Sequence, residues 1–536
     1  MPRSKSLLRH GTALSLLTLL SRVTGLAREM TKAALLGTGG LSDAFSAAFI
    51  IPNLFRRLFA EGSIAVAFIP VFKSSLLDDE KSQNGANSAC FLRCFFTFLS
   101  FFVSLAVGLG IIAAPFIVRS FGSAEFDETV FLTRLMFPFL AFVSIAALFQ
   151  GVLNSINVFA PAGFAPILLN LAAIACAWAL GNAAGNPARA MALGILIGGF
   201  LEAAVQLPFI YKNGFTIGFT SLKRAIRNEN TRAVLKLVLP TIIGMAAYQL
   251  NDLVSSALAR RAGEGVLSSL QYSLRLQELI LGVFAVSMGT VLLPSLAEAV
   301  KKGDCASYNQ NLAASINIIS LITIPVTAFS LILGEDLIRL LFQIRNFDET
   351  SVQLTLKAFR FHIAGLFFIA LNRILAPAFY ARKDSKRPTA AGIVSLSVNI
   401  ALAAFLVRKM AGGGIALALS VAGAVNTALL LILLCASSKT DRDYWKGTPF
   451  KTGAILAPAA LYLLKTAVFS VIAAAPLVLG RRYLDNLSAL TGAAGRAALL
   501  FRIAVSGIAF FAILLLLLAL SGDKYLRLIA GKLHAR

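Results

Sequence analysis

Charged residues are scarce in this sequence. Only 14% of its 536 residues are Asp, Glu, Lys or Arg, whereas soluble domains carry about 25%. Hydrophobic residues make up 58% of the chain instead. A composition this poor in charge excludes an ordinary soluble globular protein, and it suits a chain whose solvent is the lipid bilayer.

Histidine is equally rare, since the chain holds only His10, His362 and His534. A membrane enzyme acting on a lipid-linked sugar needs acids or histidines gathered around a catalytic centre, and two of these histidines lie near the ends of the chain. No nucleophile motif stands out either, so we do not expect an enzyme. An ion channel is a further alternative, but no recognisable filter sequence is present.

Cysteine gives no metal or disulfide signature. The five cysteines are Cys90, Cys94, Cys176, Cys305 and Cys435. The first two stand one helical turn apart, but no cluster of His or Asp joins them, and disulfides are rare on the cytoplasmic side of a membrane. We therefore expect no metal site and no cofactor.

Long apolar runs recur from one end of the sequence to the other. About twenty such residues cross a bilayer as a helix, and a lipid-facing backbone must satisfy its hydrogen bonds internally. The runs do not alternate, which favours helices over a barrel. We predict an all-α polytopic membrane protein with about fourteen transmembrane helices. They lie at 14–36, 44–72, 91–118, 129–155, 162–181, 188–211, 234–259, 267–297, 309–333, 352–380, 388–407, 413–436, 454–479 and 497–521.

The basic start of the chain resembles a signal peptide, but no small-residue cleavage site follows it, so we expect the first span to be retained. The net charge of +24 reflects basic loops on one side of the membrane rather than a nucleic-acid partner. These loops include 212–233, and the opposite loops are poorer in Lys and Arg. An even number of spans then predicts that both termini are cytoplasmic.

A weak internal duplication suggests two lobes. FAEGSIAVAFIP at 59–70 and VFAVSMGTVLLP at 283–294 each end a long second span of their half. Repeats of this kind are common in transporters, with the substrate site at their interface. We predict a six-helix lobe at 1–211, a cytoplasmic linker at 212–233, a second six-helix lobe at 234–436 and two additional helices within 437–536.

Arginines inside the predicted spans are the most informative charges. They are Arg22, Arg28, Arg56, Arg57, Arg275 and Arg373. Each charge near the bilayer centre costs about 2.5–3.5 kcal/mol, so these side chains must face a wet cavity or a partner. Helical spacing allows pairs of Arg57 with Glu61 and of Arg275 with Glu278, whereas the i+4 neighbour of Arg28 is Lys32.

Arginine nevertheless outnumbers acid in these spans, which leaves a cationic surplus. A guanidinium fork matches the oxygens of phosphate groups. The surplus therefore favours a multiply charged anion as substrate and disfavours a cationic drug.

Six segments carry a family resemblance. They are SRVTGLARE at 21–29, DAFSAAFIIPNLFRRLFAEGSIAVAFIPVF at 43–72, FAPAGFAPILLN at 159–170, YSLRLQE at 272–278, GTVLLPSL at 289–296 and LAPAFYARKDSKRP at 375–388. With these segments the chain resembles the MurJ (MviN) family of lipid II flippases, within the multidrug/oligosaccharidyl-lipid/polysaccharide exporter superfamily. The resemblance covers essentially the whole chain, and the segment at 43–72 is the most specific.

The resemblance implies two six-helix lobes around a cationic cavity, with the last two helices forming a groove for a lipid tail. It implies a monomeric flippase of the bacterial inner membrane that works by alternating access. Its partners would be membrane lipids and lipid II, the undecaprenyl-pyrophosphate-linked peptidoglycan precursor, which it moves from the inner to the outer leaflet. A polysaccharide-lipid or drug exporter of the same superfamily is the alternative.

The resemblance also assigns site residues. Arg22, Arg28, Arg56 and Arg275 carry over as substrate-binding residues, with Asp43 and Glu61 as gate or structural acids. Many relatives have an acid just before the last of these arginines, where this chain has Leu274, which leaves local pairing of Arg275 open.

Some members of the family that this chain resembles share a sodium-binding pocket. The pocket uses an acid on the seventh helix and an Asn and an Asp on the eleventh. Here Ser255 stands at the first acid position, with Asp252 one turn earlier. Asn399 fits the eleventh helix, but Ala403 replaces the Asp. Asp252 and Asn399 are thus the possible ion site, and the missing carboxylates predict weak sodium binding.

Overall fold

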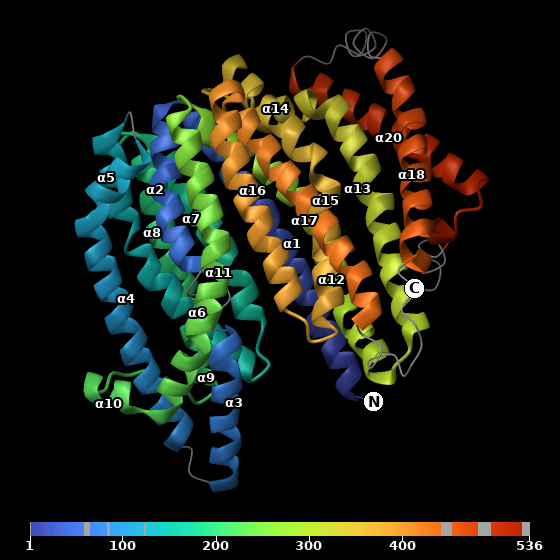
Figure 1. Cartoon of the computed structure of the whole chain (residues 1–536). Helices are drawn as coiled ribbons and strands as arrows, with labels where there is room; N and C mark the ends of the chain where they lie inside the picture. Colours follow the sequence, from blue (N-terminus) through green and yellow to red (C-terminus); the bar gives the residue numbers. More distant parts are fainter. Residues whose placement is uncertain are drawn as a thin grey trace. The chain divides into compact units, whose positions relative to one another are not determined.

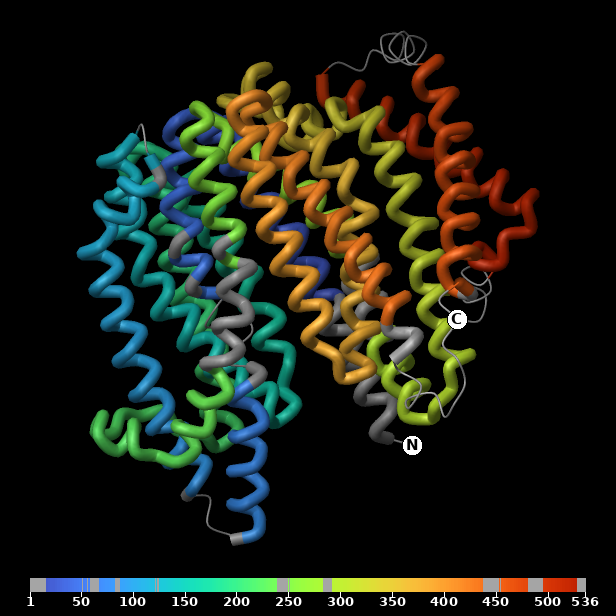
Figure 2. Tube along the Cα trace, in the orientation of Figure 1, coloured from blue at the N-terminus to red at the C-terminus, as the bar shows by residue number. Residues whose placement is uncertain are grey.

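The computed structural model describes residues 2–57, 65–82, 86–122, 125–440, 453–480 and 495–527. All regular structure within these ranges is helical, and the chain can be followed in Figure 2. It divides into two compact units. Unit 1 comprises Met1–Ser268 with Ile344–Phe347, and unit 2 comprises Ser269–Gln343 with Asp348–Arg536.

Unit 1 holds the first eleven helices and the start of the twelfth (Figure 1). They are α1 (Pro2–Leu36), α2 (Gly40–Arg56), α3 (Ala65–Ser82), α4 (Ala86–Phe121), α5 (Phe126–Met136), α6 (Phe139–Ser155), α7 (Ala160–Leu180), α8 (Pro187–Ala204), α9 (Leu207–Lys212), α10 (Leu222–Arg227) and α11 (Glu229–Arg261).

Aromatic side chains build the core of unit 1 where α3 packs on α4. Phe68, Phe72, Phe91 and Phe95 are all buried. Their ring centroids lie 5.1–6.0 Å apart, the range in which aromatic pairs attract beyond simple burial.

One glycine of α4 is required by close packing. A Cβ added at Gly110 would lie 2.1 Å from the ring of Phe137, at the junction of α5 and α6, whereas a Cβ at Gly108 would meet nothing within 4 Å. The missing side chain at 110 therefore lets α4 approach this junction.

Unit 2 holds the remaining helices. They are α12 (Val266–Lys302), whose first three residues belong to unit 1, α13 (Cys305–Phe342), α14 (Glu349–Ala364), α15 (Leu366–Tyr380), α16 (Lys386–Met410), α17 (Gly412–Thr440), α18 (Gly453–Leu479) and α20 (Arg496–Leu520).

The tenth predicted span, 352–380, is bent in the structure. Helices α14 and α15 meet at Gly365 with an angle of 42°. Ser420 of α17 donates to the carbonyl of Phe361 at 2.6 Å, and Thr427 donates to that of Phe368 at 3.3 Å. Backbone that leaves the helical pattern at membrane depth needs partners from neighbouring helices, and α17 supplies them here.

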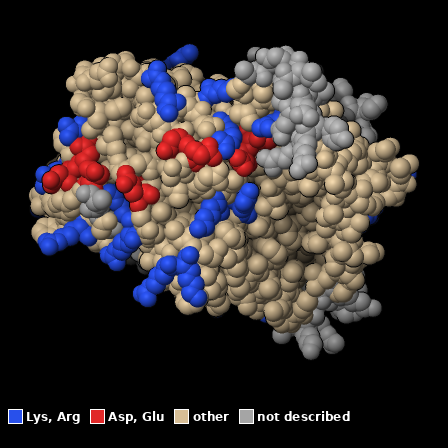
Figure 3. All heavy atoms as spheres, turned by 90° about the horizontal axis from the view of Figure 1, so that it is seen from above, with Lys and Arg blue, Asp and Glu red and all other residues tan. Residues whose placement is uncertain are grey.

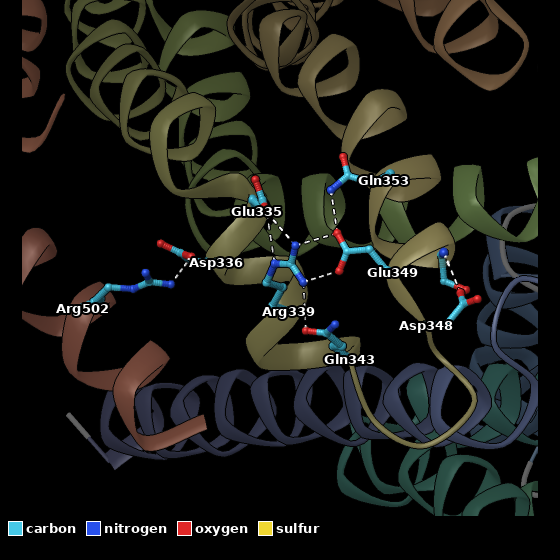
Figure 4. A network of polar contacts seen from close by, with 9 residues as sticks. Glu335, Asp336, Arg339, Gln343, Asp348, Glu349, Gln353 and Arg502 are labelled. Carbon is cyan, nitrogen blue, oxygen red and sulfur yellow. Dashed lines mark hydrogen bonds and ion pairs between the residues drawn. The ribbon is translucent and has the colours of Figure 1, made fainter. Parts of the chain in front are cut away.

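Ion pairs join the helix ends of unit 2 (Figure 4). Arg339 of α13 bridges Glu335 at 2.7 Å and Glu349, the first residue of α14, at 2.6 Å. On the same helix, Asp336 pairs with Arg502 of α20 at 2.6 Å. Apolar residues of α13, α18 and α20 also pack together in one cluster, in which Phe510 is fully buried.

The structure confirms an all-α polytopic membrane fold. Within the described residues, nine helices are long and apolar enough to cross a membrane, and the bent pair α14–α15 raises the number to ten. The four predicted spans outside this set are 14–36, 44–72, 234–259 and 267–297, which include the charged segments of α1, α2, α11 and α12. The count of fourteen stays a prediction.

Several boundaries differ from expectation. The predicted span 44–72 falls on α2 and α3, which end at Arg56 and begin at Ala65. The span 129–155 is divided into α5 and α6 at Pro138. The lobe and linker boundaries remain predictions, and α10 and α11 belong to unit 1.

Figure 3 shows mixed clusters of acidic and basic side chains beside wide areas without charge.

Candidate functional site

The first site arginines lie along α1. Arg22 is half-buried, and the turn around it is held by α7. There Asn170 donates to the hydroxyl of Thr24 at 3.2 Å and to the carbonyl of Ser21 at 3.4 Å. Both interacting segments, 21–29 and 159–170, are among those that carry the family resemblance. The contact explains why polar residues sit at these places in apolar helices.

Arg28 has an acidic partner, which corrects the interpretation drawn from Lys32. Its Nη2 lies 2.8 Å from Oε1 of Glu29, and its guanidinium lies 5.6 Å from the ring centroid of Phe49 on α2. Arg28 is only 8% exposed. Adjacent residues rarely face each other on a helix, but long side chains can bend together, and helical spacing alone missed this pair.

Two more arginines end α2. The Nε of Arg56 donates to Oδ1 of Asn53 at 2.9 Å. Arg57 lies 3.4 Å from Oδ2 of Asp252 on α11, a contact between residues 195 positions apart. Its predicted partner Glu61 lies outside the described residues. Asp252, assigned to the possible ion site, thus has a cation beside it.

Arg275 pairs with Glu278, as the i,i+3 spacing predicted. Their side chains approach to 3.1 Å on α12. Arg275 keeps 36% of its side-chain surface exposed and Glu278 keeps 50%, so the pair leaves much of the guanidinium open. The absence of an acid at Leu274 does not prevent local pairing.

Asp43, predicted to be a gate or structural acid, accepts backbone hydrogen bonds within unit 1. Its two carboxylate oxygens accept the backbone N–H groups of Gly265 and Ser268, each at 2.8 Å, and only 4% of Asp43 is exposed. Gly265 has a φ of +76°, and a Cβ there would lie 2.1 Å from the carbonyl oxygen of Thr38. The carboxylate therefore ties the tight turn at the start of α12 to α2.

The second possible ion-site residue, Asn399, is buried on α16 in unit 2. Ala403, which replaces the expected Asp, is fully buried one turn later. Asp252 and Asn399 belong to different units. No group of three or more His, Cys, Asp or Glu able to hold a metal ion occurs within the described part of the chain.

Comparisons with known proteins decide the family. The family model described as "Lipid II flippase MurJ" matches residues 32–485.

This chain belongs to the MurJ family of lipid II flippases.

Curated MurJ relatives match over most of their length. The "Probable lipid II flippase MurJ" of Treponema pallidum is 44% identical over 478 residues, covering 89% of each chain. The "Lipid II flippase MurJ" of Burkholderia cenocepacia is 34% identical over 424 residues, covering 77% of this chain and 81% of its own.

Solved structures show that the fold is shared as well. A MurJ structure in an inward closed conformation matches with a TM-score of 0.76 at 24% identity, covering 96% of this chain and 99% of that one. An inward-facing multidrug resistance transporter of the MATE family, described as belonging to the MOP superfamily, matches with a TM-score of 0.63 at 14% identity, covering 80% of this chain and 99% of that one. MurJ and these exporters thus have one architecture in common.

Sequence reasoning missed several buried polar residues. His362 of α14 contacts Ser273 of α12, and Lys32 donates to the hydroxyl of Ser46 at 2.6 Å. The isolated His in an apolar span was a visible signal, but its partner could not be found from spacing because it lies 89 residues away.

Proposed function

We propose that this chain is a lipid II flippase that moves the undecaprenyl-pyrophosphate-linked precursor from the inner to the outer leaflet by alternating access. The observation that carries the proposal is family membership, with MurJ-named relatives matching along most of both chains. Flipping requires no covalent chemistry, so the proposal assigns no catalytic residue and no cofactor.

The charges of unit 1 support an anionic substrate. Four arginines lie on α1 and at the end of α2, namely Arg22, Arg28, Arg56 and Arg57. Glu29 pairs with Arg28, and Asp252 pairs with Arg57. In the sequence of α1 and α2, basic residues outnumber Glu29 and Asp43, and a pyrophosphate would neutralise such a positive surplus.

Within this proposal, Arg28 and Arg275 each contact the pyrophosphate. Charge-assisted hydrogen bonds contribute about 1.5–3 kcal/mol, which corresponds to about ten- to hundredfold in affinity. R28A and R275A should therefore fail to complement a strain depleted of its own flippase. R28K and R275K should also be impaired, because lysine keeps the charge but loses the bidentate fork.

The assay measures lipid II reaching the outer leaflet of the depleted strain, with protein levels checked for each variant. R134A serves as the control, because Arg134 of α5 is exposed and donates to the carbonyl of Ile111. Full complementation by R28A or R275A would refute the assigned contacts.

The last two helices fit the proposed lipid-tail groove. Exposed apolar side chains follow α18 and α20, including Leu461, Val471, Leu479, Ile508 and Leu520. A lipid II analogue with a photoreactive tail should label these helices. Labelling confined to the first lobe would indicate that they only pack structurally.

We also propose that the chain is a monomer in the bacterial inner membrane, with both termini in the cytoplasm. The basic segment 212–233 supports this orientation. Reporter fusions after Lys5 and after Arg536 should both score cytoplasmic, and opposite scores would mean that the number of spans is odd.

A further inference from the structure

His362 holds α12 at two points that flank Arg275. Its ring Nδ1 lies 2.6 Å from the hydroxyl oxygen of Ser273. Its backbone carbonyl accepts a hydrogen bond from the side-chain amide of Gln277. His362 of α14 thus contacts α12 at Ser273, two positions before Arg275, and at Gln277, two positions after it.

The spacing of these contacts sets the direction of Arg275. Residues four apart lie on one face of a helix, and each residue turns the chain by about 100°. Ser273 and Gln277 therefore share the face toward α14, and Arg275 points to nearly the opposite side. The burial agrees, because Ser273 and Gln277 are 0% and 2% exposed, whereas the side chain of Arg275 is 36% exposed.

These two contacts of His362 can form only at this rotation of α12 about its own axis. His362 is 1% exposed, and buried polar groups that lose their partners are costly to leave unsatisfied. Turning α12 by a single residue would separate both Ser273 and Gln277 from their partners on α14. Apolar packing alone would tolerate such a change far better, since it has no direction.

We propose that His362 is a positioning residue for Arg275: its ring and carbonyl lock the rotation of α12 and so aim the guanidinium away from α14. The importance of this aim for transport rests on the proposed function, in which Arg275 contacts the pyrophosphate. The orientation itself can be tested without any substrate.

The first experiment measures geometry. The five native cysteines are replaced, and nitroxide labels are attached in an R275C/R360C variant; Arg360 is exposed on α14. H362L, which keeps the bulk but removes the ring nitrogens, should broaden and shift the distance distribution between the labels. S273A deletes only one hydroxyl and should shift it in the same direction with the fold preserved.

The matched control is S395A, which removes a half-buried hydrogen bond from α16 to the carbonyl of Ala422 on α17, away from the contact of α14 with α12. It should leave the label distances unchanged. Unchanged distances in both H362L and S273A would overturn the proposal. A shift in S395A as large as that in H362L would also overturn it, because general loosening would then explain the effect.

The second experiment measures transport with Arg275 intact. In proteoliposomes, H362L should raise the half-saturating lipid II concentration about tenfold, the loss expected when one charge-assisted contact is misaligned. The maximal rate should stay within about twofold of the parent, because the misaligned contact affects binding of the substrate. H362Q should restore most of the affinity, because its amide can hydrogen-bond Ser273. Label shifts with unchanged transport would uphold the positioning role and refute the substrate contact assigned to Arg275.

Discussion

At the residue scale, Asp43 satisfies two backbone donors with one side chain. Both donors, the N–H groups of Gly265 and Ser268, lie at a helix start where the first turn has no intrahelical acceptor for them. The residue was predicted as a gate or structural acid from its motif. Its contacts in unit 1 are those expected of a structural acid, and its role in transport stays a prediction.

We therefore expect D43A to destabilise the protein by about 1–3 kcal/mol, because it leaves buried donors unsatisfied. D43N should lose less, since its amide keeps one acceptor oxygen. Thermal unfolding in detergent measures both. D127N, at an exposed acid of the first turn of α5, should be neutral, and a D43A protein as stable as D127N would contradict the assignment.

Individual partners were predictable only where they are local. The pair of Arg275 and Glu278 follows from i,i+3 spacing. The contact of Arg57 with Asp252 joins residues far apart in sequence, so no pattern in the sequence could indicate it. Charge surplus in a span is a local property, but the partner that neutralises it is a tertiary one.

At the element scale, Gly108 and Gly110 offer a matched pair on one helix. G110A should destabilise by about 1–3 kcal/mol, the usual cost of overpacking, because its Cβ would overlap the ring of Phe137. G108A should be neutral or stabilising by up to about 1 kcal/mol, since alanine favours helix over glycine.

Thermal unfolding of the two variants provides the measurement, with far-ultraviolet circular dichroism as a check on helix content. Equal stability of G108A and G110A would show that α4 can move away from the junction of α5 and α6 at no cost.

Helix type was predictable from long apolar runs, whereas helix breaks were not. The span 352–380 contains Pro377, but the bend occurs at Gly365. There a Cβ would lie 2.3 Å from the hydroxyl of Ser420. The break thus depends on a neighbour that comes 55 positions later in the numbering, and periodicity within the span carries no information about it.

At the scale of the whole molecule, the charged helices bear on energy coupling. Sodium prefers hard oxygen ligands with compensating negative charge. Asp252 already has Arg57 beside it, and Ala403 offers no carboxylate. The proposed transport has another possible source of energy in the membrane potential, because each charge crossing the full field is worth about 2.3 kcal/mol per 100 mV.

We predict that transport depends on membrane potential and little on sodium. Flipping in proteoliposomes, measured with an imposed potassium gradient and valinomycin, should slow when the potential is collapsed. It should continue when sodium is replaced by a large organic cation. The reverse pattern would restore Asp252 and Asn399 as an ion site.

The overall architecture was the most predictable level. Composition and apolar runs indicate an all-α membrane protein, and the resemblance at 43–72 indicates the family. The four predicted spans outside the apolar set are those that carry the site arginines or Asp252. Charged residues lower the hydropathy of these spans, so hydropathy alone is weakest where the predicted site residues lie.

The bend between α14 and α15 has a consequence for biosynthesis. Ile363 finds its partner in Thr327 of α13, which the ribosome has already made. The carbonyl of Phe361, which lies at the break, has its partner in Ser420 of α17, which is made later. An unpaired carbonyl is costly in hydrocarbon. The order of synthesis therefore predicts that the bend acquires its full set of partners only after α17 has been made.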